Sequence, residues 1–364
     1  MNDTSVVFRA GADGYASFRI PAVVATGRGT LLAFCEGRVD GPADHGTIAI
    51  VLKRSTDGGR TWGPLTVAAA NGDGLAGNPA PVVLDTGRIL LVHVRNAGHA
   101  TEDAIRRGTV GAEDGRRVWV CHSDDDGRTW SAAREITASV KRPDWRWYAT
   151  TPGHALQLRT GRVVVPANHS LAAGPDGGHC LLSDDRGATW TLGYVDDGDG
   201  TAARVAANES TAAELPDGRL YVNARTMPPA PAPRADAYSA DGGRTLTAPF
   251  RPQPGLTGPV CQGSVLQLRD PDLLLYSGPA APGARARMTL RASTDGGTTW
   301  HPAHTVDDRP AAYSDLVRID ARTLGLLYET GDGGPYETIT FLRVPVAPPA
   351  RPGADGRADV GSGS

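Results

Sequence analysis

Apolar runs separated by tight turns recur along the whole chain. Six times an apolar run meets a turn and a second apolar run follows, which is the pattern of a β-hairpin. The six segments are "PAVVATGRGTLLAF", "PVVLDTGRILLVHV", "ALQLRTGRVVVPAN", "AAELPDGRLYVNAR", "VLQLRDPDLLLYSG" and "LVRIDARTLGLLYE". No amphipathic helical period interrupts them. The pattern predicts an all-β protein built from similar units.

A second repeat, S-x-D-x-G-x-T-W, lies between these hairpins. Its copies are "STDGGRTW" (55–62), "SDDDGRTW" (123–130), "SDDRGATW" (183–190) and "STDGGTTW" (293–300), with a partial copy, "SADGGRTL" (239–246), that has Leu246 in place of Trp. Asp suits a tight turn because its carboxylate accepts nearby backbone N–H groups, and Gly because it adopts positive φ. Trp then anchors the turn by burying a large ring.

Together the two repeats predict the architecture. A third strand follows each of the first five hairpins and leads into an octapeptide, while the sixth hairpin is followed by "YETITFLRV" without one. Six units of about four strands indicate a six-bladed β-propeller, with a β-sandwich or β-helix as the alternative. We expect one propeller domain over residues 1–345, with the N-terminal "SVVFRA" completing the last blade. Residues 346–364, rich in Pro and Gly, are expected to form a disordered tail.

Composition narrows the function classes. The chain has 364 residues, 40% of them apolar, and a formal net charge of −3 with scattered basic residues. This argues against a nucleic-acid-binding surface, and no apolar run reaches the roughly 18 residues of a membrane span. The first ten residues do not resemble a signal peptide. We therefore expect either a cytoplasmic protein or a secreted one whose sequence starts after a removed signal.

The four cysteines are Cys35, Cys121, Cys180 and Cys261, far apart and without a CxxC pair. Buried free thiols in strands are the expected state, with disulfides or metal ligation as alternatives. Neither a metal site nor a cofactor is predicted. A monomer is expected.

Strand direction alternates within a blade, so the connections alternate between two faces. Hairpin turns and octapeptides share one face, whereas the other carries the starts of first strands, the ends of second strands and the loops between second and third strands. The first strands open on Arg19, Asn78, Pro152, Glu209, Gln262 and Tyr313. The second strands end on Arg38, Asn96, His169, Arg225, Ser277 and Glu329, and two of the loops carry Asp44 and Arg285. Charged residues are therefore predicted to converge at one end of the propeller axis.

These residue types suggest a particular chemistry. Arginines aimed at one point favour a carboxylate ligand. Glu209 beside Tyr313 can take the phenol proton and make the oxygen a nucleophile. Asp44, in the Gly- and Pro-containing loop "VDGPADHG", can protonate a leaving group. The set suits a glycosidase whose sugar carries a carboxylate on the anomeric carbon, because a phenol approaches such a centre without charge repulsion.

At these positions the chain resembles the exo-α-sialidase (neuraminidase) family of bacterial and animal type, across about residues 4–345. The matching segments are "FRIP" (18–21), "FCEGR" (34–38), "DHGTIAIVLKRS" (44–55), "DWRWYATTPGHALQL" (144–158), "YVNAR" (221–225) and "AYSDL" (312–316), and the octapeptides correspond to the family's Asp boxes.

The resemblance implies roles for individual residues. Arg19, Arg225 and Arg285 match the triad that binds the sialic acid carboxylate, with Arg285 preferred to Arg287 by its offset from "MTLRAS". Tyr313 matches the nucleophile, Glu209 its base and Asp44 the acid/base, preferred to Asp40. Glu329 matches a glutamate that steadies Arg19, and Arg38 a further substrate-contacting arginine. Trp147 and Tyr148 are expected to line the glycerol or N-acetyl side of the pocket. A retaining mechanism through a tyrosyl intermediate, without cofactor, follows from the family.

Three alternatives stay open at this stage. A related enzyme could prefer KDN or another nonulosonic acid, or transfer the sugar instead of hydrolysing it. A non-catalytic Asp-box propeller that acts as a binding or interaction module is the third, although a binder needs no nucleophile and base. The expected partner is a sialylated glycan or a free sialoside.

Overall fold

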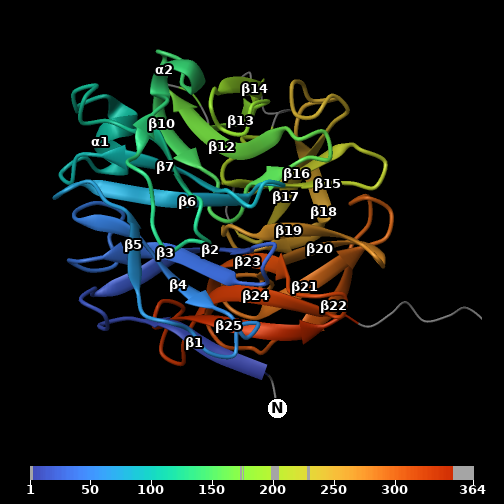
Figure 1. Cartoon of the computed structure of the whole chain (residues 1–364). Coiled ribbons are helices and arrows are strands. Elements are labelled where there is room, and N and C mark those ends of the chain that lie inside the picture. The colour runs from blue at the N-terminus through green and yellow to red at the C-terminus, as the bar shows by residue number, and fades with distance from the viewer. Residues whose placement is uncertain (1–2, 173, 175, 198–204, 228–229, 347–364) are drawn as a thin grey trace, which may run out of the picture.

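The structure, a computed structural model, describes residues 3–172, 174, 176–197, 205–227 and 230–346. Its strands form six antiparallel units around a central axis, as predicted (Figure 1). Neighbouring units contact one another through their first strands, except that β12 of the third unit contacts β15 of the fourth, and β2 contacts β23, so the ring is closed. The chain is therefore a six-bladed β-propeller. The predicted tail lies outside the described residues apart from Val346.

The blades follow one another in chain order. Blade 1 contains β2 (Ser17–Ala25), β3 (Leu31–Arg38), β4 (Ile48–Ser55) and β5 (Thr66–Ala69), and blade 2 contains β6 (Leu75–Val83), β7 (Ile89–Asn96), β8 (Arg117–Ser123) and β9 (Arg134–Glu135). Blade 3 contains β10 (Trp145–Thr150), β11 (Leu156–Gln157), β12 (Val163–Leu171), β13 (Asp176–Ser183) and β14 (Thr191–Asp196), and blade 4 contains β15 (Ser210–Glu214), β16 (Leu220–Ala224), β17 (Ala232–Ser239) and β18 (Arg251–Gly258). Blade 5 contains β19 (Ser264–Arg269), β20 (Asp272–Pro279), β21 (Met288–Ser293) and β22 (His301–Thr305), and blade 6 contains β23 (Ala311–Arg318), β24 (Thr323–Thr330), β25 (Thr338–Pro345) and β1 (Asp3–Arg9).

The N-terminal strand completes the last blade. β1 pairs antiparallel with β25, with Asp3 opposite Arg343, and the two strands lie side by side in Figure 1. Trp62 of the first Asp box stabilises this join: its indole N–H donates to Ser5 Oγ at 2.9 Å, and its ring packs edge-on against Phe341. The predicted closure of the ring by the first strand is confirmed.

Two short helices depart from the expected all-strand pattern. α1 (Glu102–Arg107) lies in the loop between β7 and β8, and α2 (Thr137–Val140) follows β9. Thr101 caps α1, because its hydroxyl oxygen accepts from the Ala104 N–H at 3.2 Å, and the left-handed Gly108 ends the helix. Helices this short carry too little periodic signal to be read from the sequence.

The buried carboxylate of Asp315 links several blades at the centre of the ring. Asp315 accepts hydrogen bonds from the Val23 N–H of blade 1 at 2.8 Å, the His154 N–H of blade 3 at 2.9 Å and the Ser264 hydroxyl of blade 5 at 2.7 Å. The oxygen that accepts from Ser264 also contacts Nδ1 of His154 at 2.7 Å. Burial opposes the imidazolium, but Asp315 outweighs it and raises the pKa of His154. This satisfied network fixes the blades relative to one another.

The Asp boxes form turns, as predicted. In blade 2, Asp125 accepts from the Ser123 and Thr129 hydroxyls at 2.8 and 2.6 Å and from the backbone N–H groups of Arg128 and Thr129. In the box that ends in Leu246, Asp241 likewise accepts from the Ser239 and Thr245 hydroxyls and from the Thr245 N–H. Because Leu31 pairs with Ser55 at one end of β3 and Arg38 with Ile48 at the other, the boxes lie on the face opposite Arg38.

The four cysteines are free and buried, as expected. Cys35, Cys121 and Cys180 lie in strands, whereas Cys261 lies in the connection before β19. Within the described residues, no helix has the length and apolar character needed to cross a membrane.

Candidate active site

A polar cavity of about 200 Å³ opens on the face opposite the Asp boxes. Its lining comes from all six blades and consists mostly of charged and amide side chains. The lining residues include Arg19, Glu36, Arg38, Asp44, Asn78, Glu102, Arg116, Trp147, Asn168, Asn208, Glu209, Arg225, Met227, Arg285 and Tyr313. The charged residues therefore converge at the end of the propeller axis that strand direction predicted.

Tyr313, Glu209 and Arg225 form a closed hydrogen-bonded triangle in this cavity. The Tyr313 hydroxyl donates to Glu209 Oε1 at 2.6 Å and accepts from Arg225 Nη1 at 3.0 Å. Arg225 also donates to Glu209 Oε2 at 2.7 Å. Glu209 and Arg225 are held opposite each other because the Arg225 N–H bonds the Glu209 carbonyl next to the β15–β16 pairing.

Burial and the Glu209 charge together raise the pKa of Tyr313 well above its usual value, although Arg225 and Arg285 act in the opposite direction. The phenol is therefore neutral at rest. A carboxylate oxygen 2.6 Å from the phenol oxygen is in position to accept its proton when that oxygen attacks.

Arg19 is held from behind by Glu329. Arg19 Nε donates to Glu329 Oε1 at 2.8 Å, and the same carboxylate accepts the N–H groups of Ile20 and Tyr313 at 2.9 and 3.1 Å. Burial opposes the guanidinium charge, but Glu329 outweighs it and raises the pKa of Arg19. The edge of the guanidinium that Glu329 does not bind faces the cavity.

Arg285 has no carboxylate partner among the described residues. Its Nη1 donates to the Tyr336 hydroxyl and its Nη2 to the Val260 carbonyl, both at 2.9 Å, and its guanidinium faces the Tyr313 ring. Arg287, the competing candidate, instead lies outside the cavity and pairs with Asp308 at 3.2 Å. Arg19, Arg225 and Arg285 thus surround Tyr313, and an anion is the natural counter-charge for the set.

Arg38 links the loop acid to the propeller wall. It is 2% exposed, and its Nη2 lies 2.6 Å from both Glu36 Oε2 and Asp44 Oδ1. Desolvation favours the neutral form of Asp44, but Arg38 and Arg19 outweigh it and lower the pKa of this carboxyl. Asp44 itself is 64% exposed, so solvent and a ligand can both reach it. Asp40, the competing candidate, is not among the lining residues.

Trp147 lines the cavity, whereas Tyr148 does not. Tyr148 is fully buried and packs edge-on against His179 inside blade 3. Successive side chains of a strand leave on opposite sides, so neighbours in β10 cannot both face the same pocket. The expectation that Tyr148 lines the pocket is therefore corrected by its position.

Six polar residues at the site escaped the sequence reasoning: Glu36, Glu102, Arg116, Asn168, Asn208 and Tyr336. Glu36 sits two residues before Arg38 on β3, and Tyr336, beside Arg19 and Arg285, lies in the last loop. Glu102 and Arg116 lie in the loop between β7 and β8. The rule that identified Asp44 and Arg285, applied to the corresponding loops of blades 2 and 6, would have pointed to Glu102, Arg116 and Tyr336.

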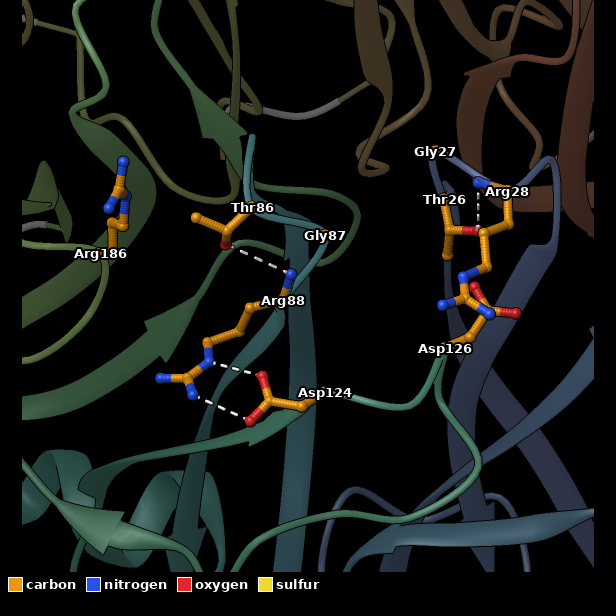
Figure 2. Close-up of a pocket in the computed structure, with 9 residues that line it drawn as sticks. All are labelled: Thr26, Gly27, Arg28, Thr86, Gly87, Arg88, Asp124, Asp126 and Arg186. Atoms are coloured by element: carbon orange, nitrogen blue, oxygen red, sulfur yellow. Dashed lines mark hydrogen bonds and ion pairs between the residues drawn. The ribbon is translucent and has the colours of Figure 1, made fainter.

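A second, larger hollow of about 480 Å³ lies at the opposite end, among the hairpin turns and Asp boxes (Figure 2). Its arginines mostly have internal partners: Arg88 makes two parallel bonds to Asp124 at 2.7 and 2.8 Å, and Arg186 lies 3.5 Å from Asp85. No phenol or thiol lines it. Within the described part of the chain, no cluster of His, Cys, Asp and Glu could hold a metal ion. The chemistry of the molecule therefore concentrates in the smaller cavity.

The fold and the site define an Asp-box β-propeller with an arginine-lined cavity, and comparison with known proteins identifies the family. The model of the BNR repeat-like domain matches residues 29–326. The chain is 31% identical to a sialidase of Bacteroides fragilis over 89% of its own length and 62% of the relative's. It is 34% identical to an exo-α-sialidase of Aspergillus fumigatus over 78% of its own length and 69% of the relative's.

A solved structure, the Hadza microbial sialidase Hz136, superimposes with a TM-score of 0.84 at 30% identity, over 94% of this chain and 68% of that one. The chain belongs to the sialidase family. It spans 62% of the Bacteroides fragilis relative and 52% of a Micromonospora viridifaciens sialidase to which it is also similar.

Proposed function

We propose that the protein is an exo-α-sialidase that hydrolyses terminal α-linked sialic acids from glycoconjugates with retention of configuration. The observation that carries this proposal is the 2.6 Å hydrogen bond from the Tyr313 hydroxyl to Glu209. A glycan-binding propeller needs arginines but has no use for a buried phenol with a carboxylate base. Family membership supports the same reaction class.

Arg19, Arg225 and Arg285 would bind the substrate carboxylate. Arg285 lacks a carboxylate partner within the described chain, and Arg19 keeps one edge free because Glu329 engages its Nε. A carboxylate bound there places the anomeric carbon next to Tyr313. Glu329 acts as a positioning residue for both groups, since its two oxygens hold Arg19 and the backbone of Tyr313.

In the first step the Tyr313 oxygen bonds to the anomeric carbon as the bond to the aglycone oxygen breaks. The phenol proton passes to Glu209, and Asp44 delivers a proton to the departing oxygen. In the second step Asp44 takes a proton from water, the water oxygen bonds to the anomeric carbon, and Tyr313 leaves and recovers its proton from Glu209. No cofactor is required.

The ion pair with Arg38 favours the ionised form of Asp44, which suits the second step. In the first step Asp44 must carry a proton, which its ion pair with Arg38 disfavours. The bound aglycone therefore has to separate Asp44 from Arg38. The high exposure of Asp44 allows this rearrangement.

Two finer alternatives belong to the same site. The sugar could be KDN or another nonulosonic acid, and the sialyl group could pass to a hydroxyl other than that of water. Both use the same tyrosine and arginines. Side-by-side hydrolysis of the 4-methylumbelliferyl glycosides of N-acetylneuraminic acid and KDN, with product analysis by NMR, distinguishes them.

Covalent trapping tests the proposal directly. 2,3-Difluorosialic acid gives a covalent intermediate with the Trypanosoma rangeli sialidase. Incubation of the present protein with this reagent should release fluoride from C2 and add one 3-fluorosialyl mass, located on Tyr313 by peptide mapping. Absence of hydrolysis with every sialoside tried, together with no adduct, would refute the proposed function.

A further inference from the structure

Arg285 is the least anchored of the three arginines proposed to bind the substrate carboxylate. Arg19 and Arg225 each form an ion pair with a glutamate, at 2.8 and 2.7 Å, whereas Arg285 has no carboxylate partner among the described residues. Arg285 also lies in the loop between β20 and β21, and not in a strand. A long side chain on such a loop needs contacts beyond its own backbone to be held in one position.

Tyr336 supplies such a contact. Two hydrogen bonds hold the Arg285 guanidinium, one to the Val260 carbonyl and one to the Tyr336 hydroxyl, both at 2.9 Å. Within the part of the chain that the structure describes, Tyr336 is therefore the one side chain that hydrogen-bonds this guanidinium. Its ring meets a second arginine, because the guanidinium carbon of Arg19 lies 3.9 Å from the ring centre. This contact occupies none of the Arg19 N–H groups, of which Glu329 engages Nε.

Tyr336 is itself fixed by its loop, which connects β24 to β25 in blade 6. The Glu337 carboxylate closes this loop because it accepts the N–H groups of Asp332 and Gly333, at 3.0 and 2.8 Å. The Glu337 carbonyl accepts the Ala10 N–H at 3.0 Å, which joins the loop to the end of β1. Blade 6 lies between blades 5 and 1 in the closed ring. Tyr336 therefore reaches one arginine of each neighbouring blade from a position that blade 6 sets.

We propose that Tyr336 is a positioning residue that fixes Arg285 and Arg19 relative to each other, so that a ligand carboxylate meets both guanidinium groups in one arrangement. Without the hydroxyl of Tyr336, Arg285 would keep a single hydrogen bond to a backbone carbonyl, and binding of the ligand would have to order it. This cost falls on carboxylate binding and not on the attack by Tyr313, because the carboxylate is held before and throughout the reaction. The inference rests on the proposed function and deepens it.

The test separates KM from kcat in two variants, with the 4-methylumbelliferyl glycoside of N-acetylneuraminic acid as substrate. Tyr336→Phe loses only the hydrogen bond to Arg285, and we expect KM to rise about fivefold with kcat changed by less than about twofold. Tyr336→Leu also loses the ring contact with Arg19, so KM should rise by about a further fivefold. The phenylalanine variant thus keeps part of the binding, and it serves alone if the leucine variant does not fold.

Binding of the inhibitor DANA gives the same comparison without turnover. DANA is bound in a solved structure of the Trypanosoma rangeli sialidase. Its Kd, measured by calorimetry with the unaltered protein and both Tyr336 variants, should rise by about the same factors as KM.

Tyr238→Phe is the matched control. The Tyr238 hydroxyl also makes one hydrogen bond, to the Gly296 carbonyl at 3.0 Å, and its ring also contacts an arginine, Arg219 at 5.1 Å, but it lies outside the cavity. KM and Kd should therefore not change.

Tyr336 variants that keep the KM and Kd of the unaltered protein, or that lose kcat by as much as KM rises, overturn the inference while leaving the proposed function intact. If the unaltered protein binds DANA but hydrolyses no sialoside, the proposed function fails and the Kd values still decide the role of Tyr336. If it does neither, both fail.

Discussion

The carboxylate of Asp44 is bound to Arg38 at 2.6 Å, although Asp44 belongs to an exposed loop and Arg38 to the buried end of β3. This pair joins the part of the site that solvent reaches to the part that the propeller holds rigid. It also keeps Asp44 close to the cavity without placing a second carboxylate against Tyr313.

Removal of this acid should depend on the leaving group. With Asp44→Ala we expect kcat/KM to fall by about 10²–10⁴ for sialyllactose, because general acid catalysis contributes about that much for a poor leaving group. The loss should be far smaller for an aryl sialoside, whose phenolate leaves without a proton. Asp40→Ala in the same loop is the control. Equal losses on both substrates would contradict the assigned role.

Loss of the nucleophile should abolish turnover while preserving the fold. Tyr313→Phe removes one oxygen from a buried ring, and we expect kcat on an aryl sialoside to fall about 10³-fold or more. Circular dichroism and thermal unfolding check that the variant is folded. Full activity of Tyr313→Phe would rule out the covalent mechanism.

The Asp boxes should affect stability without affecting catalysis. Asp125 accepts four hydrogen bonds within its turn, on the face opposite the cavity. Asp125→Ala is expected to lower the free energy of unfolding by about 1–3 kcal/mol, with kcat/KM of the folded enzyme unchanged. In Asp124→Ala, which removes an exposed pair with Arg88, the cost should stay below about 1 kcal/mol. A change of KM in Asp125→Ala would show that the boxes influence the site.

His93 predicts a pH dependence of stability. It is fully buried on β7, and burial, followed by the charge of Arg95, lowers the pKa of His93 to about 3. Its folded pKa lies below the unfolded value of about 6.5, so its contribution is complete above pH 6.5 and is lost as the pH falls from there toward 3. At pH 5.0 the loss relative to pH 7.5 amounts to about 2 kcal/mol.

Guanidinium unfolding at pH 7.5 and 5.0 measures this loss, with His93→Gln as the comparison. The variant loses stability at both pH values, but its difference between the two should be about 2 kcal/mol smaller than that of the unaltered protein. An unchanged difference would show that another group is responsible.

Much of the architecture was predictable because strands and turns carry periodic signals. The hairpins and Asp boxes counted the blades, and alternation of strand direction placed Arg19, Glu209 and Tyr313 on one face. The first strand of blade 3 was an exception: it divides into β10 and β11 around Pro152 and Gly153, a break that an apolar pattern does not reveal.

Loops and strand faces limited the prediction of the site. The family resemblance assigned both Trp147 and Tyr148 to the pocket, yet adjacent strand residues face opposite sides, and Tyr148 packs against His179. Glu102 and Arg116 lie in the loop between β7 and β8, and they were missed because loop residues were considered only in blades 1 and 5.

The closure of blade 6 has a consequence for how the protein is made. Asp3 pairs with Arg343, so β1 cannot complete its blade until the chain has been synthesised as far as Arg343. Until then, β1 and the open side of blade 1 are exposed to other nascent chains. Slower synthesis lengthens this interval, and release of an incomplete chain leaves it permanent.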